Sequence, residues 1–220
     1  MFYFYADYIA PASVLVPLII GLNRYKKTSI GHRFLLCMLA FSALTTIIAR
    51  VFAYVYRNNL IVIQSYTVGE FLFLAGFYYC QFQSKVMKRI IIVLLTLFSI
   101  FTIYLIVIFI GVIRFDDYAP SGESILLIFL SIALFNKNNE SLSRIAIWHQ
   151  DPINWFNTGI LLYFSGSLFI FLLSNYITDP KTMVYQIVWN IQITFLVLLS
   201  LLFAIGFYKI KSEKTTPVGA

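Results

Sequence analysis

Residues 90–113 read IIIVLLTLFSIFTIYLIVIFIGVI, a run that contains no charged residue. A helix needs about 20 apolar residues to cross the hydrocarbon core of a bilayer. The run therefore predicts a transmembrane helix over Ile90–Ile113. It also indicates that lipid, rather than water, surrounds most of the chain.

The overall composition agrees with a membrane protein. Of the 220 residues, 60% are hydrophobic and 11% are charged, and the mean hydropathy is +0.86. Soluble domains have about 45–50% apolar and about 25% charged residues. A soluble fold of this length could not hide so much apolar surface from water. The net charge of +7 is explained by membrane topology, so nucleic acid is not an expected partner.

Further apolar runs lie on both sides of this stretch and give seven predicted helices in total. They cover Phe4–Leu22, Phe34–Tyr56, Ile61–Phe82, Ile90–Ile113, Ser121–Phe135, Trp155–Ile177 and Met183–Tyr208. The fifth run is the shortest, so it could be tilted or partly re-entrant. A count of six helices is therefore the main alternative.

The distribution of basic residues favours seven helices. With seven crossings, one side of the membrane receives twelve of the 16 Lys and Arg residues: Arg24, Lys26, Lys27, Arg33, Lys85, Lys88, Arg89, Lys137, Arg144, Lys209, Lys211 and Lys214. The positive-inside rule assigns this side to the cytoplasm. Without the fifth helix, Lys137, Arg144 and the C-terminal lysines would move to the other side. We therefore expect an all-α, seven-helix bundle in the cell membrane, with its N-terminus outside and its C-terminus in the cytoplasm.

The chain is expected to form one transmembrane domain over residues 1–211, with a short disordered cytoplasmic tail over residues 212–220. The first ten residues contain no Lys or Arg, so no secretory signal is predicted and the first helix is expected to be retained. Cys37 and Cys80 fall near cytoplasmic helix ends, where free thiols are expected. The two cysteines and two histidines show no metal-ligand spacing, and no cofactor is predicted.

Glu70 is the candidate ligand-binding residue, because it is the acidic residue expected deep in a predicted helix. It lies about ten residues from the outer end, or roughly 15 Å at about 1.5 Å per residue. Carboxyl groups at this depth usually face the bundle interior or a wet cavity. Helical spacing places polar and aromatic residues on the same face: Tyr66, Thr67, Phe73, Phe77 and Gln81. A structural carboxyl group, hydrogen-bonded between helices, is an equally good interpretation.

Other predicted helices offer polar groups that could join Glu70. Arg50 could form an ion pair with Glu70, although extension toward the outer headgroups is the favoured interpretation. In the sixth predicted helix, Tyr163 lies on a stripe with Gly159 and Gly166, where small residues allow close helix packing.

In the seventh predicted helix, Gln186, Trp189 and Asn190 share a face in the outer half of the membrane. A shallow polar and aromatic pocket between the third, sixth and seventh helices is therefore expected, open to the outside.

No reaction can be assigned from motifs. Metalloprotease, serine-hydrolase and nucleotide-binding patterns are absent, and His32 and His149 fall in cytoplasmic turns. No catalytic residue is predicted. Asp116, Asp117 and Glu123 are assigned to an outer loop, so Glu70 is expected to have no second carboxyl group beside it. A carboxylate pair is typical of many proton-coupled carriers, and its expected absence counts against that class.

Two segments resemble the seven-helix membrane regions of bacterial sensor proteins that are often joined to histidine kinases. One is Glu70-Phe-Leu-Phe in a tyrosine-rich helix followed by Lys85–Arg89. The other is Trp155-Phe-Asn-Thr-Gly-Ile-Leu-Leu-Tyr163-Phe-Ser-Gly166, which leads to Ser174-Asn175. The resemblance covers the middle and last thirds of the chain. No kinase follows the last helix, so the resemblance implies a sensor that acts through a separate partner, and no catalytic residue is carried over.

The first interpretation of function is therefore a sensor or receptor-like subunit that binds a small or lipidic ligand and signals to a cytoplasmic or membrane protein. A small transporter or channel that uses Glu70 is one alternative. A structural subunit of a membrane complex is another. An intramembrane enzyme acting on lipid has the least support, because a carboxyl group with nearby tyrosines is its only sequence feature.

Overall fold

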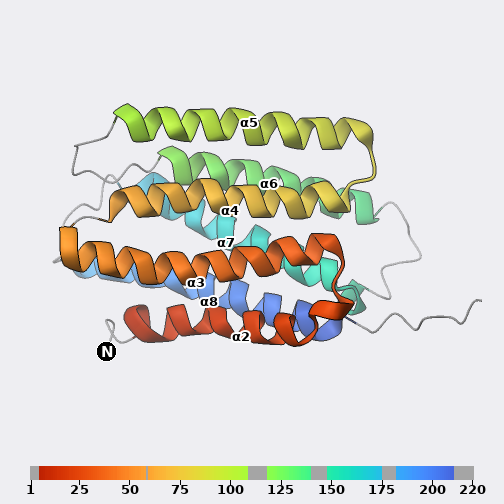
Figure 1. The fold of residues 1–220 in the computed structure, drawn as a ribbon, viewed down its shortest axis with the longest axis horizontal. Coiled ribbons are helices and arrows are strands. Elements are labelled where there is room, and N and C mark those ends of the chain that lie inside the picture. Colours follow the sequence, from red (N-terminus) through yellow and green to blue (C-terminus); the bar gives the residue numbers. More distant parts are fainter. Residues whose placement is uncertain (1–4, 58, 109–117, 140–147, 175–181, 211–220) are drawn as a thin grey trace, which may run out of the picture.

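The chain forms an antiparallel bundle of helices in the computed structural model, which describes residues 5–57, 59–108, 118–139, 148–174 and 182–210. Its seven α-helices are α2 (Ala10–Asn23), α3 (Ile30–Tyr56), α4 (Leu60–Gln81), α5 (Lys85–Ile108), α6 (Tyr118–Asn139), α7 (Pro152–Ser174) and α8 (Met183–Lys209). A π-helical turn, η1 (Tyr5–Ile9), precedes α2, and a 3-10 turn, η2 (Tyr25–Lys27), follows it. Successive α-helices run in opposite directions (Figure 1).

Six of these helices, α3 to α8, are long and apolar enough to cross a membrane. Helices suit this environment because every backbone hydrogen bond is made within the segment, with no help from water. The described chain therefore has the character of a multi-pass membrane protein. The first helix, α2, has 14 residues and is shorter than the others. Pro11 lies in its first turn, where proline costs no hydrogen bond, and η1 extends the helical path toward the N-terminus.

Several predicted helices have different bounds in the structure. The second was expected from Phe34 and the fourth from Ile90, but α3 begins at Ile30 and α5 at Lys85. The fifth was expected over Ser121–Phe135, but α6 continues in both directions to cover Tyr118–Asn139. Polar residues at both ends of α6 made the apolar run look shorter than the helix. The sixth was expected from Trp155, but α7 begins at Pro152, because Asp151 Oδ1 accepts a hydrogen bond from the Ile153 amide at 2.9 Å.

The helices form a closed ring with one helix outside it. The ring follows the order α2, α3, α4, α6, α7, α8, and α8 returns to contact α2. Helix α5 lies against α4 and α6 at the edge of the bundle (Figure 1). Its outer side chains, such as Ile92, Leu97 and Ile100, are exposed, as expected for a face that contacts lipid. The ring order brings polar residues of α4, α6, α7 and α8 toward a common interior.

Close packing between α7 and α8 depends on glycine. A methyl group at Gly159 would come within 3.2 Å of Leu199, and one at Gly166 would overlap the ring of Phe195. The predicted role of these two glycines in helix packing is therefore confirmed. Near the same interface, the Phe156 ring lies 5.3 Å from Phe203 and 4.8 Å from Phe207, measured between centroids.

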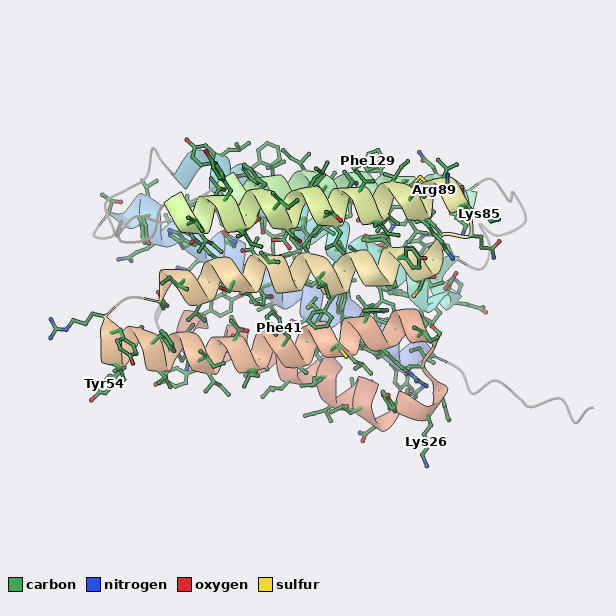
Figure 2. The ribbon with its side chains drawn as sticks, turned by 45° about the horizontal axis from the view of Figure 1, so that its top comes forward. Lys26, Phe41, Tyr54, Lys85, Arg89 and Phe129 are labelled. Carbon is green, nitrogen blue, oxygen red and sulfur yellow. The ribbon has the colours of Figure 1, made fainter. Side chains whose placement is uncertain are left out.

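Basic residues gather at one end of the bundle. Figure 2 shows Lys26, Lys85 and Arg89 at this end and Tyr54 at the opposite end. Lys137 and Lys209, at the ends of α6 and α8, also lie here. The prediction that these basic segments share one side is confirmed for the described residues. We call this region the basic end.

Aromatic rings hold several of these cations in place. Arg24 lies over Tyr208 at 5.0 Å, Arg33 over Tyr25 at 4.8 Å, and Lys88 over Tyr79 at 5.0 Å, each measured to the ring centroid. Further contacts of this kind join Lys137 to Phe82 and Lys209 to Trp155. Mixed aromatic and basic side chains are typical of the membrane–water interface. The basic end therefore has the composition of an interfacial layer.

The α7–α8 contact predicts different outcomes for two Gly→Ala substitutions. Gly166→Ala should lower the free energy of unfolding by about 1–3 kcal/mol, because the new methyl group overlaps the Phe195 ring. Gly122→Ala is the matched control, since its methyl group would lie 3.7 Å from Phe98, an ordinary contact. Thermal unfolding of both variants in detergent checks this. Equal midpoints for the two variants would contradict the packing described here.

Candidate functional site

A buried carboxyl group lies halfway along α4. Glu70 is 5% exposed, and its Oε1 accepts a hydrogen bond of 2.8 Å from the hydroxyl of Tyr66, one turn earlier on the same helix. Both residues were predicted to share a face, and the hydrogen bond confirms that they lie together. The Phe41 ring of α3 stacks on Tyr66 with a centroid distance of 5.7 Å. Figure 2 shows Phe41 between α3 and α4, so Tyr66 is held against Glu70 from one side.

A second carboxyl group lies beside Glu70, and this corrects the sequence-based expectation. Glu123 is 3% exposed and belongs to α6, not to an outer loop. It is close enough to Glu70 for the two carboxyl groups to interact electrostatically. The expectation that Glu70 has no neighbouring carboxyl group is therefore wrong. Asp116 and Asp117, the other acidic residues assigned to that loop, lie outside the described residues.

Helices α7 and α8 add polar groups to the carboxyl pair. Tyr163 of α7 interacts electrostatically with both Glu70 and Glu123, and Ser167 and Gln192 lie beside its hydroxyl group. Ser167 is fully buried, one turn beyond Tyr163 on α7, and Gln192 comes from α8. Tyr163 therefore lies near Glu70, and its participation in ligand binding stays a prediction.

Five helices contribute to this group of side chains. Ser42 of α3 lies beside the Tyr66 hydroxyl and completes the set. We call the set the polar cluster, and its members are Ser42, Tyr66, Glu70, Glu123, Tyr163, Ser167 and Gln192. A polar group from α3, α4, α6, α7 and α8 therefore converges near the middle of the bundle. Any movement of one of these helices against the others would change the cluster.

Several polar atoms of the polar cluster form no hydrogen bond within the described part of the chain. Glu123 Oε1, Ser167 Oγ and Gln192 Oε1 are buried and are in hydrogen-bonding geometry with no described group, although Ser167 and Gln192 lie near enough to the Tyr163 hydroxyl to interact with it. Unpaired buried polar atoms are rare in proteins and usually have a specific explanation, such as a bound ion, water or ligand. Each such atom costs about 1–3 kcal/mol when it stays unpaired. Three of them within one cluster, on three different helices, identify it as the candidate ligand site.

The predicted residues of the last helix have contacts within α8 itself. Asn190 donates a 2.6 Å hydrogen bond to the Gln186 backbone oxygen, and the Trp189 ring lies 5.8 Å from Tyr185 along the same helix. Gln192 is two positions beyond Asn190, which is roughly 200° around a helix. Asn190 Oδ1 is nevertheless buried and has no hydrogen-bonding partner among the described residues. The inclusion of Gln186, Trp189 and Asn190 in the ligand site stays a prediction.

Phe77 lies apart from the polar cluster, and Arg50 differs from Glu70 in its exposure. Phe77 is fully buried two turns beyond Glu70, toward the basic end, where its ring meets Phe156 at a centroid distance of 6.3 Å. It therefore belongs to the aromatic core between α4 and α7. Arg50 is exposed on α3, whereas Glu70 is buried. The pairing of Arg50 with Glu70 stays a prediction.

Toward the basic end, a second polar network is fully paired. Tyr78 of α4 donates a 2.8 Å hydrogen bond to Asn157 Oδ1 of α7 and shares one of 2.5 Å with Ser131 Oγ of α6. Asn157 Nδ2 in turn donates to the Ser131 backbone oxygen at 3.0 Å. This network joins α4, α6 and α7, and its members are completely buried. Complete pairing indicates a structural role, in contrast to the polar cluster.

The cysteines offer no further site. Cys37 and Cys80 are free and exposed, which confirms the expectation of unpaired thiols. Among the described residues, no three His, Cys, Asp or Glu side chains come together in a way that could hold a metal ion.

Comparisons with known proteins leave the function to be argued from this geometry. The chain matches no family model, and no curated protein or solved structure matches it. The resemblance to membrane regions of bacterial sensors therefore stays a prediction.

The paired network predicts a stability effect at Tyr78. Tyr78→Phe should lower the free energy of unfolding by about 1–3 kcal/mol, because Ser131 and Asn157 would lose a buried partner. Tyr79→Phe is the control, since Tyr79 is exposed next to it on α4. Thermal unfolding in detergent measures both. A loss at Tyr79→Phe as large as that at Tyr78→Phe would contradict the assigned role.

Proposed function

We propose that the chain is a receptor-like membrane subunit that binds a small ligand at the polar cluster and signals through a partner at its basic end. The observation that carries the proposal is the convergence of five helices on buried, unpaired oxygen atoms of Glu123, Ser167 and Gln192. A ligand that bonded these atoms would link α6, α7 and α8. Ligand binding would then favour one arrangement of the bundle, which is what a receptor requires.

The proposal includes seven membrane crossings. In this arrangement η1 and α2 form the first crossing, the N-terminus is outside, and the basic end faces the cytoplasm of the cell membrane. Support comes from the gathering of Lys26, Lys85 and Arg89 at one end (Figure 2) and from the general excess of Lys and Arg in cytoplasmic loops.

The basic end is the proposed surface for a partner. Here Arg24 Nη1 donates to the Ile210 backbone oxygen at 2.8 Å, and Lys137 Nζ donates to the Gln81 backbone oxygen at 2.6 Å. These bonds tie the inner ends of several helices together. A change in helix arrangement at the polar cluster would therefore also move the helix ends at the basic end, where a cytoplasmic or membrane protein can bind.

Native mass spectrometry tests the receptor proposal. Protein extracted mildly from its own membrane should retain a small molecule, ion or lipid of defined mass, and Glu70→Gln should lose that mass. Asp151→Asn is the matched control, because it also neutralises a carboxyl group but caps α7 at the basic end. The same preparations, photo-cross-linked at Lys26 or Lys85, should capture a protein partner. Protein that retains no ligand and captures no partner would contradict the proposal.

A small carrier or channel is the second candidate. The specific observation in its favour is Glu123, since two interacting carboxyl groups inside a transmembrane bundle are typical of proton or cation pathways.

Flux measurements in liposomes separate the two candidates. A carrier should move protons or cations, and Glu70→Gln or Glu123→Gln should reduce the flux about tenfold or more, because each removes a charge from the pathway. Asp151→Asn should leave the flux unchanged. The receptor proposal predicts no flux above that of empty liposomes, so flux that depends on both glutamates would favour the carrier.

A further inference from the structure

We propose that the polar cluster binds a metal cation that prefers oxygen ligands, held between Glu70 and Glu123 and completed by neutral oxygen atoms of α7 and α8. The inference names the ligand class of the site proposed above and rests on that site. It applies equally if the chain is a receptor or a carrier, because it concerns what the cluster binds.

The pair of carboxyl groups is the first argument. Glu70 and Glu123 are both almost fully buried and interact with each other. Among the described residues, Tyr66 and Tyr163 are titratable side chains that interact with them, and neither carries a positive charge. Two adjacent buried carboxyl groups can take up protons, because burial and mutual repulsion disfavour both charges, or they can stay ionised with a cation between them. A bound cation would offset both the cost of burial and the repulsion.

The unpaired atoms are the second, independent argument. Ser167 is fully buried, lies beside the Tyr163 hydroxyl, and its Oγ has no hydrogen-bonding partner among the described residues. Gln192 Oε1 on α8 and Glu123 Oε1 on α6 are also buried and have no hydrogen-bonding partner among the described residues. All three are oxygen atoms with lone pairs to offer. A ligand that accepts electron pairs from several directions therefore suits them, and a metal cation does so.

Ligand type decides which metals fit. The cluster offers carboxylate, amide and hydroxyl oxygen atoms, which suit hard cations such as Na⁺, K⁺ and Ca²⁺. Zinc and other transition metals prefer sites rich in His and Cys. No group of three His, Cys, Asp or Glu side chains forms among the described residues, so a cation between the two carboxylates would need the neutral oxygen atoms to complete its site. One divalent cation would balance both carboxylates. One monovalent cation would balance a single carboxylate while the other carries a proton.

Thermal unfolding of the purified full chain tests the proposal directly. Separate titrations use NaCl, KCl and CaCl₂ at constant ionic strength, with the bulky N-methylglucamine cation as the replacement salt, and methylammonium chloride as an organic cation. A metal cation that binds the folded protein raises the unfolding midpoint in a saturable way. At least one of the three metal salts should do so, while methylammonium should not. No response to any metal salt, or a response to methylammonium alone, would overturn the proposal.

Variants place the site. Glu123→Gln keeps the shape of the side chain but removes its charge, and should weaken the apparent cation affinity by about tenfold or more. Asp151→Asn should bind as the wild type does. Should Glu123→Gln fail to fold, Ser167→Ala removes a neutral ligand from the same cluster and should also weaken binding. A cation response that is unchanged in both cluster variants would show that the cation binds elsewhere, which would overturn the proposal.

The outcomes separate this inference from the proposed function. A cation effect that depends on Glu123, in a protein that captures no partner and passes no flux, would support the inference and contradict the receptor and carrier proposals. A protein that responds to no metal cation but captures a partner in a way that depends on Glu70 would contradict the inference and support the receptor proposal.

Discussion

Burial of Glu70 inside an apolar bundle is the constraint on which the arrangement of the site depends. A carboxyl group surrounded by transmembrane helices cannot be solvated by bulk water, so its partners must come from the neighbouring helices. Tyr66 supplies one hydrogen bond from the same helix. The remaining neighbours are polar groups that α6, α7 and α8 bring to the same depth. The order of the helices around the ring therefore satisfies two requirements. It brings the polar groups together, and it packs the apolar surfaces against one another.

The bundle contains two polar layers with different properties. Toward the basic end, Tyr78, Ser131 and Asn157 satisfy one another across three helices. Nearer the middle, the polar cluster draws on five helices and keeps unpaired oxygen atoms on Glu123, Ser167 and Gln192. The first layer holds α4, α6 and α7 in a fixed arrangement. The second layer has unpaired oxygen atoms that can bind a ligand within that arrangement. This division is typical of binding sites that a rigid scaffold supports.

Much of the fold could be predicted from the sequence, because the signals are long and physically simple. Apolar runs located the helices, and the alternation of basic segments predicted which helix ends lie together. Glycine spacing on α7 predicted its close contact with α8. Shorter polar signals were harder to interpret. The Asp151-Pro152 pair marks the start of α7, but it lies outside the apolar run that was used to locate the helix.

The site was only partly predictable, and the reason is geometric. Glu70, Tyr66 and Tyr163 could be selected from depth and helical spacing. Glu123 could not, because the polar start of α6 resembles a loop when its burial against α4 is unknown. Gln192 could not be selected either, since the rotation of α8 about its axis depends on which helices surround it. Neighbour order in a bundle comes from packing between distant segments, and one sequence does not contain that information.

An experimental density map of the protein in a lipid nanodisc would show whether the polar cluster holds a bound species. The measurement is the density between Glu70 and Glu123, at a resolution that separates side-chain oxygen atoms. We expect a bound species in contact with Glu123 Oε1, Ser167 Oγ and Gln192 Oε1. A close-packed interior in which these three oxygen atoms bond only to other protein groups would contradict this expectation, and would make the polar cluster a structural feature of the bundle.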